Sequence, residues 1–402
     1  MAASSCNRAS QVFVALYYNQ PPLYLLCVEA QNEITGIAVA MEKYKVLFIH
    51  KFFTTGGGVE RVHKNLSQAL GDEGVTSVFY VHDVTGESKE GFSQLQDSFS
   101  AFAADSNNGF RQKLSYLYSL IKRKEINVII AATETANILA FLCKLRFPKL
   151  KVIYTRHCAF DVSDQKLAPW AIKALYSLYS LSNGKIIAVS ESLKQQIKDA
   201  VIFGKNKVSF IPNAVLQPSI AELSIKSPQS PLPERYFCGV GRLVEQKGFD
   251  LLLEAYSKAR LKDATLPELV IVGAGEDLEA LKKQAASLGI NKVVHFTGFT
   301  TNPYCIIKRA EAFVLSSRHE GMPTVLVEAM SLNTPVIAFD CPTGPSELIT
   351  PDETGILVKA LDTDALANAL CNYNSLKSKP ISDKVKHFSY KNVANAYIAQ
   401  FG

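Results

Sequence analysis

Short apolar runs alternate with amphipathic stretches along most of the chain. From Met41 onwards, β-rich runs such as KVLFIH (45–50), INVIIAA (126–132) and KIIAVS (185–190) are each followed by a stretch with helical spacing of apolar residues. Continuous apolar runs are typical of strands buried on both faces, as in a parallel sheet covered by helices. The pattern therefore predicts an α/β protein made of doubly wound parallel sheets.

The alternation occurs in two successive series. Residues 216–233 are rich in proline and serine and lack helical periodicity, so we interpret them as a linker or long loop. Strand-like runs begin again with RYFCGVGR (235–242), and a single amphipathic helix is expected near the end of the chain. We expect two Rossmann-like domains, 41–215 and 216–384, followed by a C-terminal helix in 385–402.

The first forty residues do not follow this pattern. Residues 11–30 are apolar, but Asn19, Gln20 and the pair Pro21–Pro22 interrupt them. Adjacent prolines in the middle of the run argue against a spanning helix, which needs about 20 apolar residues in a row. We expect residues 1–40 to be a poorly ordered extension, and we expect no other segment to cross a membrane.

Composition narrows the class of protein only slightly. Of the 402 residues, 48% are hydrophobic and 20% are charged, which is typical of a globular protein with substantial cores. The net charge of +6 suits anionic ligands or an anionic membrane face, and it is weak evidence for nucleic acid, which we do not expect as a partner. The eight cysteines have neither zinc-site nor CxxC spacing, so we expect reduced thiols in a cytoplasmic protein.

Candidate chemical groups follow several of the predicted strands. Gly56, Gly57 and Gly58 lie between a strand and a helix, where backbone amides could approach a phosphate or sugar, although a flexible turn explains them as well. His157 ends the run KVIYTRH and could orient or protonate a hydroxyl, although a lone histidine is more often structural.

The second series contains a candidate diphosphate clamp. Arg242 and Lys247 lie five residues apart on a loop that opens a helix, and they could bind a diphosphate through a guanidinium fork and a point charge. The alternative is a solvated basic loop that Glu245 neutralises. Gly298 and Phe299 follow another strand and could lie against a flat base.

The stretch RHEGMPTVLVE (318–328) combines two carboxylates with a predicted helix start. Pro323 suits the first helical turn, so Glu320 falls in the preceding loop and Glu328 in the second turn. The amides between them lie at a helix N-terminus, which attracts an anion. This arrangement suits a nucleotide sugar, with hydroxyls at both ends and phosphate in the middle. The amides belong to Gly321, Met322, Thr324 and Val325.

These motifs together resemble a known family. Glu320 and Glu328 match the EX7E motif of retaining GT-B glycosyltransferases. The chain also resembles glycosyltransferase family 4 (group 1) in four other motifs, which occur in the same order as in the family: GGGVERV, GRLVEQKGFDLLLEA, VGAGEDLEAL and PTGPSELI. The resemblance covers about residues 44–400. It implies the GT-B fold, with a facing acceptor domain and donor domain and a C-terminal helix that crosses back to the N-terminal domain.

The resemblance also implies roles for single residues. Arg242 and Lys247 would hold the donor diphosphate. Glu328 would bind the ribose hydroxyls, and Glu320 would face the donor sugar. His157 fits the position of a histidine that contacts the transferred sugar, although Cys158 stands where the family commonly has an acidic residue. The other residues expected at the donor site are Gly57, Gly58, Gly298, Phe299, Gly321, Met322, Thr324 and Val325.

The reaction implied is a retaining transfer of the hexosyltransferase type. A sugar would pass from a nucleoside-diphosphate sugar, by default a UDP-sugar, to a hydroxyl of a glycan or lipid-linked glycan in lipopolysaccharide, O-antigen or capsule biosynthesis. No cofactor and no metal are expected. The one DxD sequence, Asp362-Thr363-Asp364, is interpreted as a helix N-cap.

A peripheral contact with the inner leaflet of the cytoplasmic membrane is a further expectation. Basic and aromatic residues of the first domain could form such a surface, although a solvated face over core aromatics explains them equally well. The basic residues are Lys122, Arg123, Lys124, Lys144, Arg146, Lys149 and Lys151, and the aromatic residues are Phe110, Tyr116, Tyr118, Trp170, Tyr176 and Tyr179.

Two other classes of function stay open. A GT-B-fold isomerase, like the UDP-sugar 2-epimerases, would need acid and base groups placed elsewhere, and EX7E counts against it. A non-catalytic nucleotide-sugar-binding subunit would have no need of Glu320, Glu328, Arg242 and Lys247 together.

Overall fold

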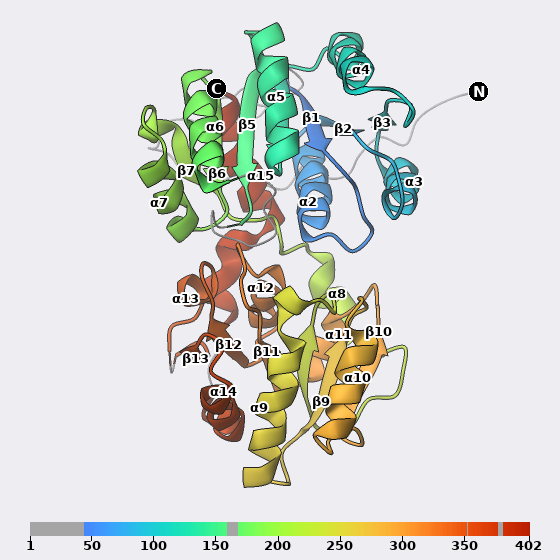
Figure 1. The fold of residues 1–402 in the computed structure, drawn as a ribbon, viewed down its shortest axis with the longest axis vertical. Helices are drawn as coiled ribbons and strands as arrows, with labels where there is room; N and C mark the ends of the chain where they lie inside the picture. Colours follow the sequence, from blue (N-terminus) through green and yellow to red (C-terminus); the bar gives the residue numbers. More distant parts are fainter. Residues whose placement is uncertain (1–43, 159–167, 352, 377–380) are drawn as a thin grey trace, which may run out of the picture. The chain divides into compact units, whose positions relative to one another are not determined.

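Two parallel sheets organise the residues that the structure describes (Figure 1). The computed structural model describes residues 44–158, 168–351, 353–376 and 381–402. The extension expected in residues 1–40 lies outside these ranges. Tyr44 to Gly402 form one unit.

The first sheet has seven strands among the described residues, in the order β3-β2-β1-β4-β5-β6-β7, and every adjacent pair is parallel. The order reverses between β1 and β4, which makes this the topological switch point of the sheet. The strands are β1 (Lys45–His50), β2 (Thr76–Val81), β3 (Ala101–Ala103), β4 (Val128–Ala132), β5 (Lys151–Arg156), β6 (Lys185–Ala188) and β7 (Val208–Phe210).

Helices cover both faces of the first sheet. Alternate residues of β1 divide between two buried clusters, with Val46 and Phe48 in one and Leu47 and Ile49 in the other. This two-sided burial explains the continuous apolar runs in the sequence. The helices are α2 (Gly58–Asp72), α3 (Ser88–Ser98), α4 (Phe110–Arg123), α5 (Glu134–Arg146), α6 (Pro169–Leu181) and α7 (Glu191–Ala200).

The second sheet has six described strands in the order β10-β9-β8-β11-β12-β13, again all parallel, and its switch point lies between β8 and β11. The strands are β8 (Tyr236–Val240), β9 (Glu268–Val272), β10 (Val294–Gly298), β11 (Ala312–Leu315), β12 (Val336–Asp340) and β13 (Ile356–Lys359). The helices are α9 (Phe249–Lys262), α10 (Leu278–Ser287), α11 (Tyr304–Arg309), α12 (Thr324–Ser331), α13 (Pro345–Leu348) and α14 (Thr363–Cys371). The predicted α/β class with doubly wound parallel sheets is confirmed.

The interpretation of residues 216–233 as a loop is wrong for one part. Helix α8 (Ser219–Ile225) forms there, directly after Pro218. Ile220 and Ser224 are buried one turn apart, and Asn302 Nδ2 donates a hydrogen bond of 2.9 Å to the carbonyl of Leu223. A helix this short shows no readable periodicity, and packing against the α11 region stabilises it.

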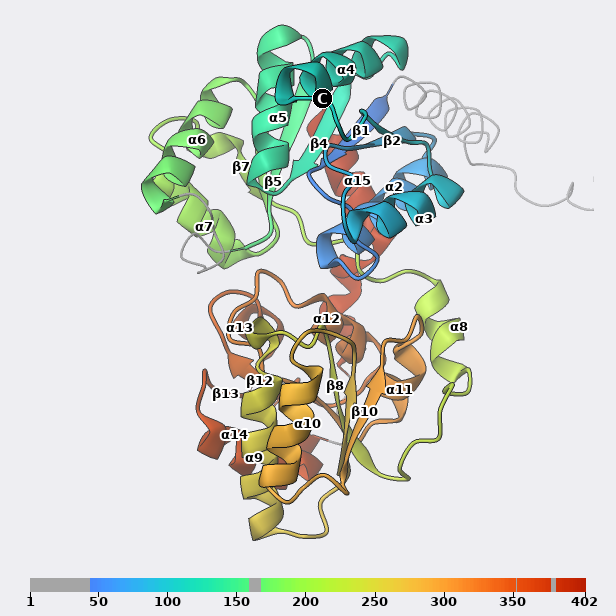
Figure 2. The same cartoon turned by 45° about the vertical axis from the view of Figure 1, so that its right-hand side comes forward.

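The single C-terminal helix expected over 385–401 is also wrong in detail. A 3₁₀ segment, η4 (Ser382–Phe388), ends at Ser389, whose hydroxyl accepts from the amide of Asn392 at 3.3 Å and starts α15 (Tyr390–Ile398). Tyr390 donates to Asp72 of α2 at 2.6 Å. Helix α15, red in Figures 1 and 2, therefore lies beside α2 against the first sheet.

Two further expectations concern membranes and thiols. Within the described ranges, no helix is long and apolar enough to cross a bilayer. The six described cysteines are free, and Cys6 and Cys27 lie outside the described residues.

Candidate active site

Most of the candidate residues follow strands at or close to the switch points of the two sheets. In the first sheet, Gly57 and Gly58 follow β1, and His157 follows β5, two strands away. In the second sheet, Arg242 and Lys247 follow β8, and Glu320 follows β11. Ligands of doubly wound sheets bind outside the carboxyl ends of the strands at such points, so the topology alone selects these two edges.

Backbone contacts hold three loops of the second sheet together. The amides of Gly241 and Leu243 donate to the carbonyls of Val272 and Ala274 at 3.0 and 2.9 Å. The amide of Gly273, which has φ +149°, donates to Gly298, and a Cβ at position 273 would collide with the Gly241 carbonyl. The glycines of VGAGE thus permit close packing of these loops.

The loop that carries Lys247 is tied to the loop that carries Glu320. Arg318 donates two hydrogen bonds of 2.7 Å to the carboxylate of Asp250 at the start of α9, and its amide donates to Gln246 at 2.8 Å. Gly248 has φ +61°, and a side chain there would collide with the carbonyl of Ser316. These contacts fix the two loops relative to each other.

Lys247 and Glu320 form an ion pair. Lys247 Nζ lies 2.6 Å from Glu320 Oε1, and the hydroxyl of Ser317 donates to the same oxygen at 2.7 Å. Glu320 is only 8% exposed. Beside this pair, burial and the negative charge of Glu320 raise the pKa of Cys341 to about 12, so this thiol is neutral. Arg242 is exposed on the same loop.

The loop before α12 is tightly enclosed. Thr343, which has φ +65°, donates its hydroxyl to the carbonyl of Glu320 at 2.5 Å. Gly344 has φ +98° and packs on Pro323, Gly321 and Met322. Positive φ at a buried threonine is strained backbone of the kind found at functional sites. The enclosure fixes the position of the Gly321 and Met322 amides, while the Met322 side chain is buried in the core.

Glu328 is paired across the two sheets. It is 1% exposed, and its Oε1 accepts from Arg61 Nη2 of α2 at 2.7 Å. The same nitrogen donates to the hydroxyl of Thr324 at 3.0 Å. Burial raises the pKa of Glu328, and the charge of Arg61 opposes this shift. Glu328 Oε2 is buried and has no hydrogen-bond partner among the described residues.

The Gly57–Gly58 loop brings a further carboxylate into the site. Gly57 is the N-cap of α2, and a Cβ there would collide with the carboxylate of Glu60. Burial raises the pKa of Glu60, while hydrogen bonds around Thr54 and the charge of Arg242 lower it. Glu60 therefore lies within the field of Arg242, and the first sheet's glycine loop approaches the basic loop of the second.

His157 is held by Thr155. Its Nε2 lies 2.9 Å from Thr155 Oγ1, and that hydroxyl donates its proton to the carbonyl of Ala131 at 2.9 Å. A hydroxyl has one proton, so Thr155 accepts from His157, and Nε2 carries the hydrogen. Burial and the charge of Arg156 lower the pKa of His157 to about 4. Neutral imidazole therefore presents Nδ1 as an acceptor.

Two more histidines lie beneath His157. His63 Nδ1 is 2.9 Å from His50 Nε2, and the rings of His63 and His157 meet edge to face at 6.0 Å. His50 and His63 are 2% and 1% exposed. Burial, reinforced by His157, lowers the pKa of His50 to about 3, and burial also lowers the pKa of His63. All three rings are therefore neutral at neutral pH.

Two further direct contacts join the two sheets. Gly321 lies so close to the His157 carbonyl that a Cβ at position 321 would collide with it. Glu347 of α13 accepts from the amides of Glu191 and Ser192 at 2.7 and 3.0 Å, which places its carboxylate at the N-terminus of α7. These contacts, with Arg61–Glu328, bring the two switch points together.

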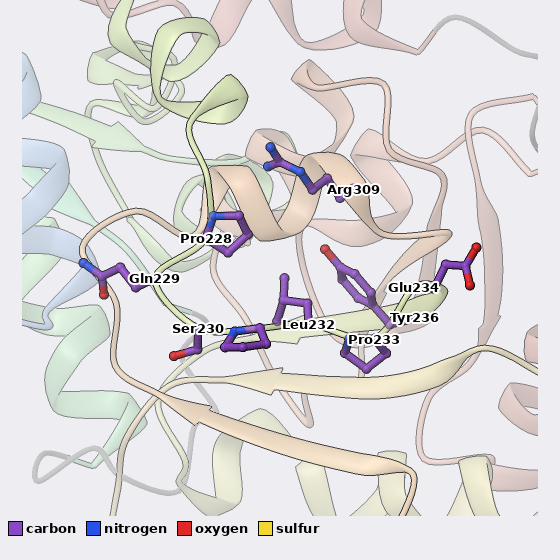
Figure 3. Close-up of a pocket in the computed structure, with 9 residues that line it drawn as sticks. Pro228, Gln229, Ser230, Leu232, Pro233, Glu234, Tyr236 and Arg309 are labelled. Carbon is purple, nitrogen blue, oxygen red and sulfur yellow. The ribbon is translucent and has the colours of Figure 1, made fainter.

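Phe299 is the predicted site residue that lies apart from the ion pairs. Its ring is 62% exposed and lines a hollow of about 230 Å³, together with Thr297, Thr300 and the segment from Leu223 to Leu232. A second hollow of about 690 Å³ lies along the same proline-rich segment, between Pro228 and Arg309 (Figure 3). None of the residues lining these hollows carries a predicted catalytic role.

The DxD sequence forms a helix cap. Asp362 Oδ1 accepts from the amide of Ala365 at 2.9 Å and starts α14, as predicted. Asp364 lies 3.1 Å from Lys258. Among the described residues, no group of three or more His, Cys, Asp or Glu side chains is placed to bind a metal.

The basic and aromatic set of the first domain is divided between core and surface. Tyr176 and Tyr179 are 1% exposed core residues, so for these two the alternative of core aromatics is confirmed. Lys144 donates to the carbonyls of Pro148 and Leu150. Trp170, in contrast, is 75% exposed.

Sequence reasoning missed Glu60, Arg61, Thr155 and Glu347. Glu60 and Arg61 belong to the quoted GGGVERV, and Glu347 belongs to PTGPSELI. The motifs therefore contained the signal, but Glu347 and Arg61 contact residues 155 and 267 positions away, and only the fold identifies those partners.

Two family models match the chain. The model of Glycosyltransferase Family 4 matches residues 56–215, and the model of Glycosyl transferases group 1 matches residues 221–390. Between them they cover most of the chain. The protein therefore belongs to the group 1 and family 4 glycosyltransferases, and it is a transferase with the GT-B fold.

Relatives and solved structures agree with this family. The chain is 26% identical to the lipopolysaccharide core biosynthesis glycosyltransferase LpsD of Rhizobium meliloti, over 89% of this chain and 98% of LpsD. It is 26% identical to the Escherichia coli UDP-Gal:alpha-D-GlcNAc-diphosphoundecaprenol alpha-1,3-galactosyltransferase, over 72% of this chain and 75% of that protein. The fold matches Anabaena HepE, solved with UDP and glucose, at a TM-score of 0.69 and 17% identity, covering 89% and 98% of the two chains.

Proposed function

We propose that this protein is a retaining glycosyltransferase that moves a sugar from a UDP-sugar to a hydroxyl of a glycan or lipid-linked glycan. The observation that carries the proposal is the Lys247–Glu320 ion pair at the β8–β11 switch point, beside Arg242 and the start of α12. This edge combines two cations, a helix N-terminus and two carboxylates. A ligand with a diphosphate between two sets of hydroxyls, such as a nucleotide sugar, would complement these groups.

In this proposal, the diphosphate binds to the two cations and to the N-terminus of α12. Arg242 offers a fork for phosphate oxygens, and Lys247 offers a point charge. The amides of Thr324 and Val325 begin α12 and point toward an anion at its N-terminus. Gly57 and Gly58 allow the first sheet's loop to approach the same phosphates.

The hydroxyls of the donor form hydrogen bonds with the two carboxylates in this proposal. Glu328 has a buried oxygen free for a ribose hydroxyl. Glu320, held by Lys247 and Ser317, faces the donor sugar, and neutral His157 accepts from a sugar hydroxyl through Nδ1. Gly298 and Phe299 lie toward the base.

The proposed chemical step needs no protein nucleophile. The bond between the anomeric carbon and the β-phosphate oxygen breaks, and its electron pair stays on the phosphate. The acceptor oxygen bonds to the anomeric carbon from the same face, and its proton passes to the departing phosphate oxygen. Arg242 and Lys247 stabilise the charge that develops there. In this scheme no metal is required.

The names of two relatives support the proposed donor and pathway. LpsD acts in lipopolysaccharide core biosynthesis, and the name of the Escherichia coli relative includes UDP-galactose and a diphosphoundecaprenol-linked sugar. We extend these properties to this protein as a UDP-sugar donor, a lipid-linked acceptor and a role in cell-surface polysaccharide assembly at the cytoplasmic side of the membrane.

The peripheral membrane contact is proposed at one surface, the α6 surface, which consists of Trp170, Leu178, Leu181, Ile202 and Phe203. The amide of Ile202 donates to Ser177 at 3.3 Å, and Ser180 donates to the carbonyl of Phe203 at 2.7 Å, so the loop lies on the helix. Trp170 and Ile202 are 75% and 73% exposed.

Lysines accompany these apolar side chains. Lys173 and Lys205 are exposed, and Lys207 donates to the carbonyl of Ser180 at 2.8 Å. An apolar surface with lysines around it matches the interface of an anionic lipid leaflet, into which such side chains insert.

The function is tested by a donor screen. Purified protein is incubated with UDP-, GDP- and ADP-sugars, with and without a bacterial lipid extract, and nucleotide release and sugar products are measured. The proposal predicts UDP release that depends on the extract, together with a lipid-linked product of retained anomeric configuration. Interconversion of UDP-sugars without UDP release would instead identify an isomerase.

The membrane contact is tested by vesicle flotation. The protein should float with phosphatidylcholine vesicles that contain phosphatidylglycerol and much less with phosphatidylcholine alone. A Trp170→Ser, Phe203→Ser double variant should lose flotation, whereas Leu261→Ser, at an 87% exposed residue of the second sheet's α9, should keep it. Equal flotation of both variants would contradict the assignment of this surface.

A further inference from the structure

Glu328 is a buried carboxylate whose charge depends on one partner. Its side chain is 2% exposed, and Arg61 from the other sheet is its only ion-pair partner among the described residues. A buried carboxylate is costly unless a cation or hydrogen bonds compensate it. Arg61 therefore supplies what Glu328 needs to stay ionised inside the protein.

The contact also fixes the geometry of α12. Arg61 Nη2 reaches both Thr324 Oγ1 at 3.0 Å and Glu328 Oε1 at 2.7 Å. Thr324 and Glu328 are four residues apart on α12 and lie on one face of the helix. One guanidinium nitrogen thus bridges the first turn, where a diphosphate is proposed, and the second turn, where the ribose is proposed.

The second oxygen of Glu328 is left without a protein partner. Oε2 is buried and accepts no hydrogen bond from the described residues. Buried acceptors are nearly always satisfied, so Oε2 is available to a donor that the described part of the protein does not itself supply. Because Arg61 occupies Oε1, the direction of Oε2 is defined before any ligand binds.

We infer that Arg61 is a positioning residue for the nucleotide, which holds Glu328 ionised and turned so that Oε2 accepts a ribose hydroxyl. It acts through Glu328 and not by touching the nucleotide itself. The inference rests on the proposed binding of a nucleoside diphosphate at α12. Its consequence is that a residue of the acceptor-side sheet controls affinity for the donor.

Arg61 also gives nucleotide binding a predicted pH dependence. Besides the two partners themselves, the groups whose charges act on this pair are Lys64 from α2 and Tyr304 from α11. Burial and the charge of Arg61 lower the pKa of Lys64, and burial and Glu328 raise the pKa of Tyr304, which keeps it neutral. Without Arg61, only burial acts on Glu328, so its pKa rises further. As pH falls, the variant should then lose ionised Glu328, and with it nucleotide affinity, at a higher pH than the wild type.

The test measures UDP binding by calorimetry across neutral and mildly acidic pH. Arg61→Met should weaken binding roughly 10- to 100-fold, as expected for loss of a charge-assisted contact, and should shift the pH profile upward. Arg61→Lys should restore part of the affinity. Glu328→Gln should bind weakly without the pH step, and adding Arg61→Met to it should change little. Arg111→Met, an exposed arginine on α4, is the matched control.

The outcomes separate this inference from the proposed function. Wild-type protein that binds none of UDP, GDP and ADP would overturn both. Wild-type protein that binds UDP, with an Arg61→Met variant that is folded by thermal melting and binds equally well, would overturn only the role of Arg61. An equal loss of UDP affinity on adding Arg61→Met to the wild type and to the Glu328→Gln variant would also overturn the role of Arg61, because Arg61 would then act independently of Glu328.

Discussion

The two switch points differ in charge. At the end of the second sheet, Lys247 pairs with Glu320, and Arg242 stands exposed beside them. At the end of the first sheet lie Gly57, Gly58 and the neutral imidazole of His157, above two more neutral histidines. The second edge consists mainly of charged groups and the first mainly of neutral polar groups, although both belong to parallel sheets with a similar strand order.

This difference in charge suggests which edge binds which part of the substrates. Strong, fixed charges suit a diphosphate, whose negative charge grows as the leaving group departs. Neutral acceptors and donors suit sugar hydroxyls, which carry no charge. Glu60 and Arg61 of α2 are the exceptions on the first sheet, and the charge of Arg61 is directed across to Glu328 of the second.

Loss of Lys247 should have the largest effect. Lys247→Met removes the cation beside the proposed leaving group and leaves Glu320 without its ion-pair partner, so kcat should fall by roughly 10²- to 10³-fold. The measurement is UDP release with lipid extract. Lys262→Met, on the exposed side of α9, is the control and should keep its rate. A Lys247→Met rate within twofold of the wild type would refute the charged edge as the donor site.

Gly321→Ala should separate the two edges. The added methyl group collides with the His157 carbonyl, so the loop before α12 and the end of β5 must move apart. Displacement of reacting groups by about 1 Å costs on the order of 10²-fold in rate. Gly71→Ala, which has open space around it, should leave kcat/KM unchanged. If both variants were equally active, contact between the two edges would not matter for turnover.

Thr155→Val tests the neutral edge. The fully buried hydroxyl fixes the Nε2–H tautomer of His157, and its loss should lower kcat/KM about tenfold, within the range of one hydrogen bond. Thr155→Ser should recover most of the activity because it keeps the hydroxyl. An inactive serine variant, despite normal thermal melting, would show that the methyl packing of Thr155 and not its hydrogen bond is what His157 needs.

The buried histidines should make stability depend on pH. Burial lowers the pKa of His50 to about 3 and of His157 to about 4, against 6.5 in the unfolded chain. Unfolded protein therefore binds more protons between these values, and the free energy of unfolding should fall as pH drops from about 6.5, by up to about 1.4 kcal/mol per pH unit for each histidine. Urea titrations at several pH values measure this slope. His63→Phe should reduce it, and an unchanged slope would show that His63 does not contribute.

The smallest effect is expected at the DxD sequence. Asp362→Ala removes the N-cap of α14 and should lower stability by about 1 kcal/mol, without loss of transfer activity. Chemical denaturation and UDP release measure the two quantities. Loss of activity that added Mg²⁺ or Mn²⁺ changes would contradict the cap interpretation and indicate a metal role.

Much of the fold could be predicted from apolar periodicity because both sheets are buried on two faces. Residues 45–50, for example, form β1 as predicted. Helix α8 could not be predicted, because seven residues show no period and Asn302 and α11 stabilise it from another segment. The break at Ser389 was equally hidden, since apolar spacing continues across it. The domain boundaries at residues 215 and 384 stay predictions.

The candidate site could be predicted only as a set of residues in loops. Local sequence placed Glu320 before α12 and Glu328 within it, because Pro323 marks a helix start. It could not show that Lys247 pairs with Glu320, or that Arg61 reaches Glu328, because these contacts join positions 73 and 267 residues apart. The roles of all these residues stay predictions until a ligand is observed.

A crystal structure of the protein with UDP would show directly whether the charged edge binds the donor. We expect the diphosphate to lie within hydrogen-bond distance of Lys247 Nζ and of the first amides of α12, with a ribose hydroxyl on Glu328 Oε2. UDP bound at the β1–β4 end of the first sheet, away from Lys247, would contradict it.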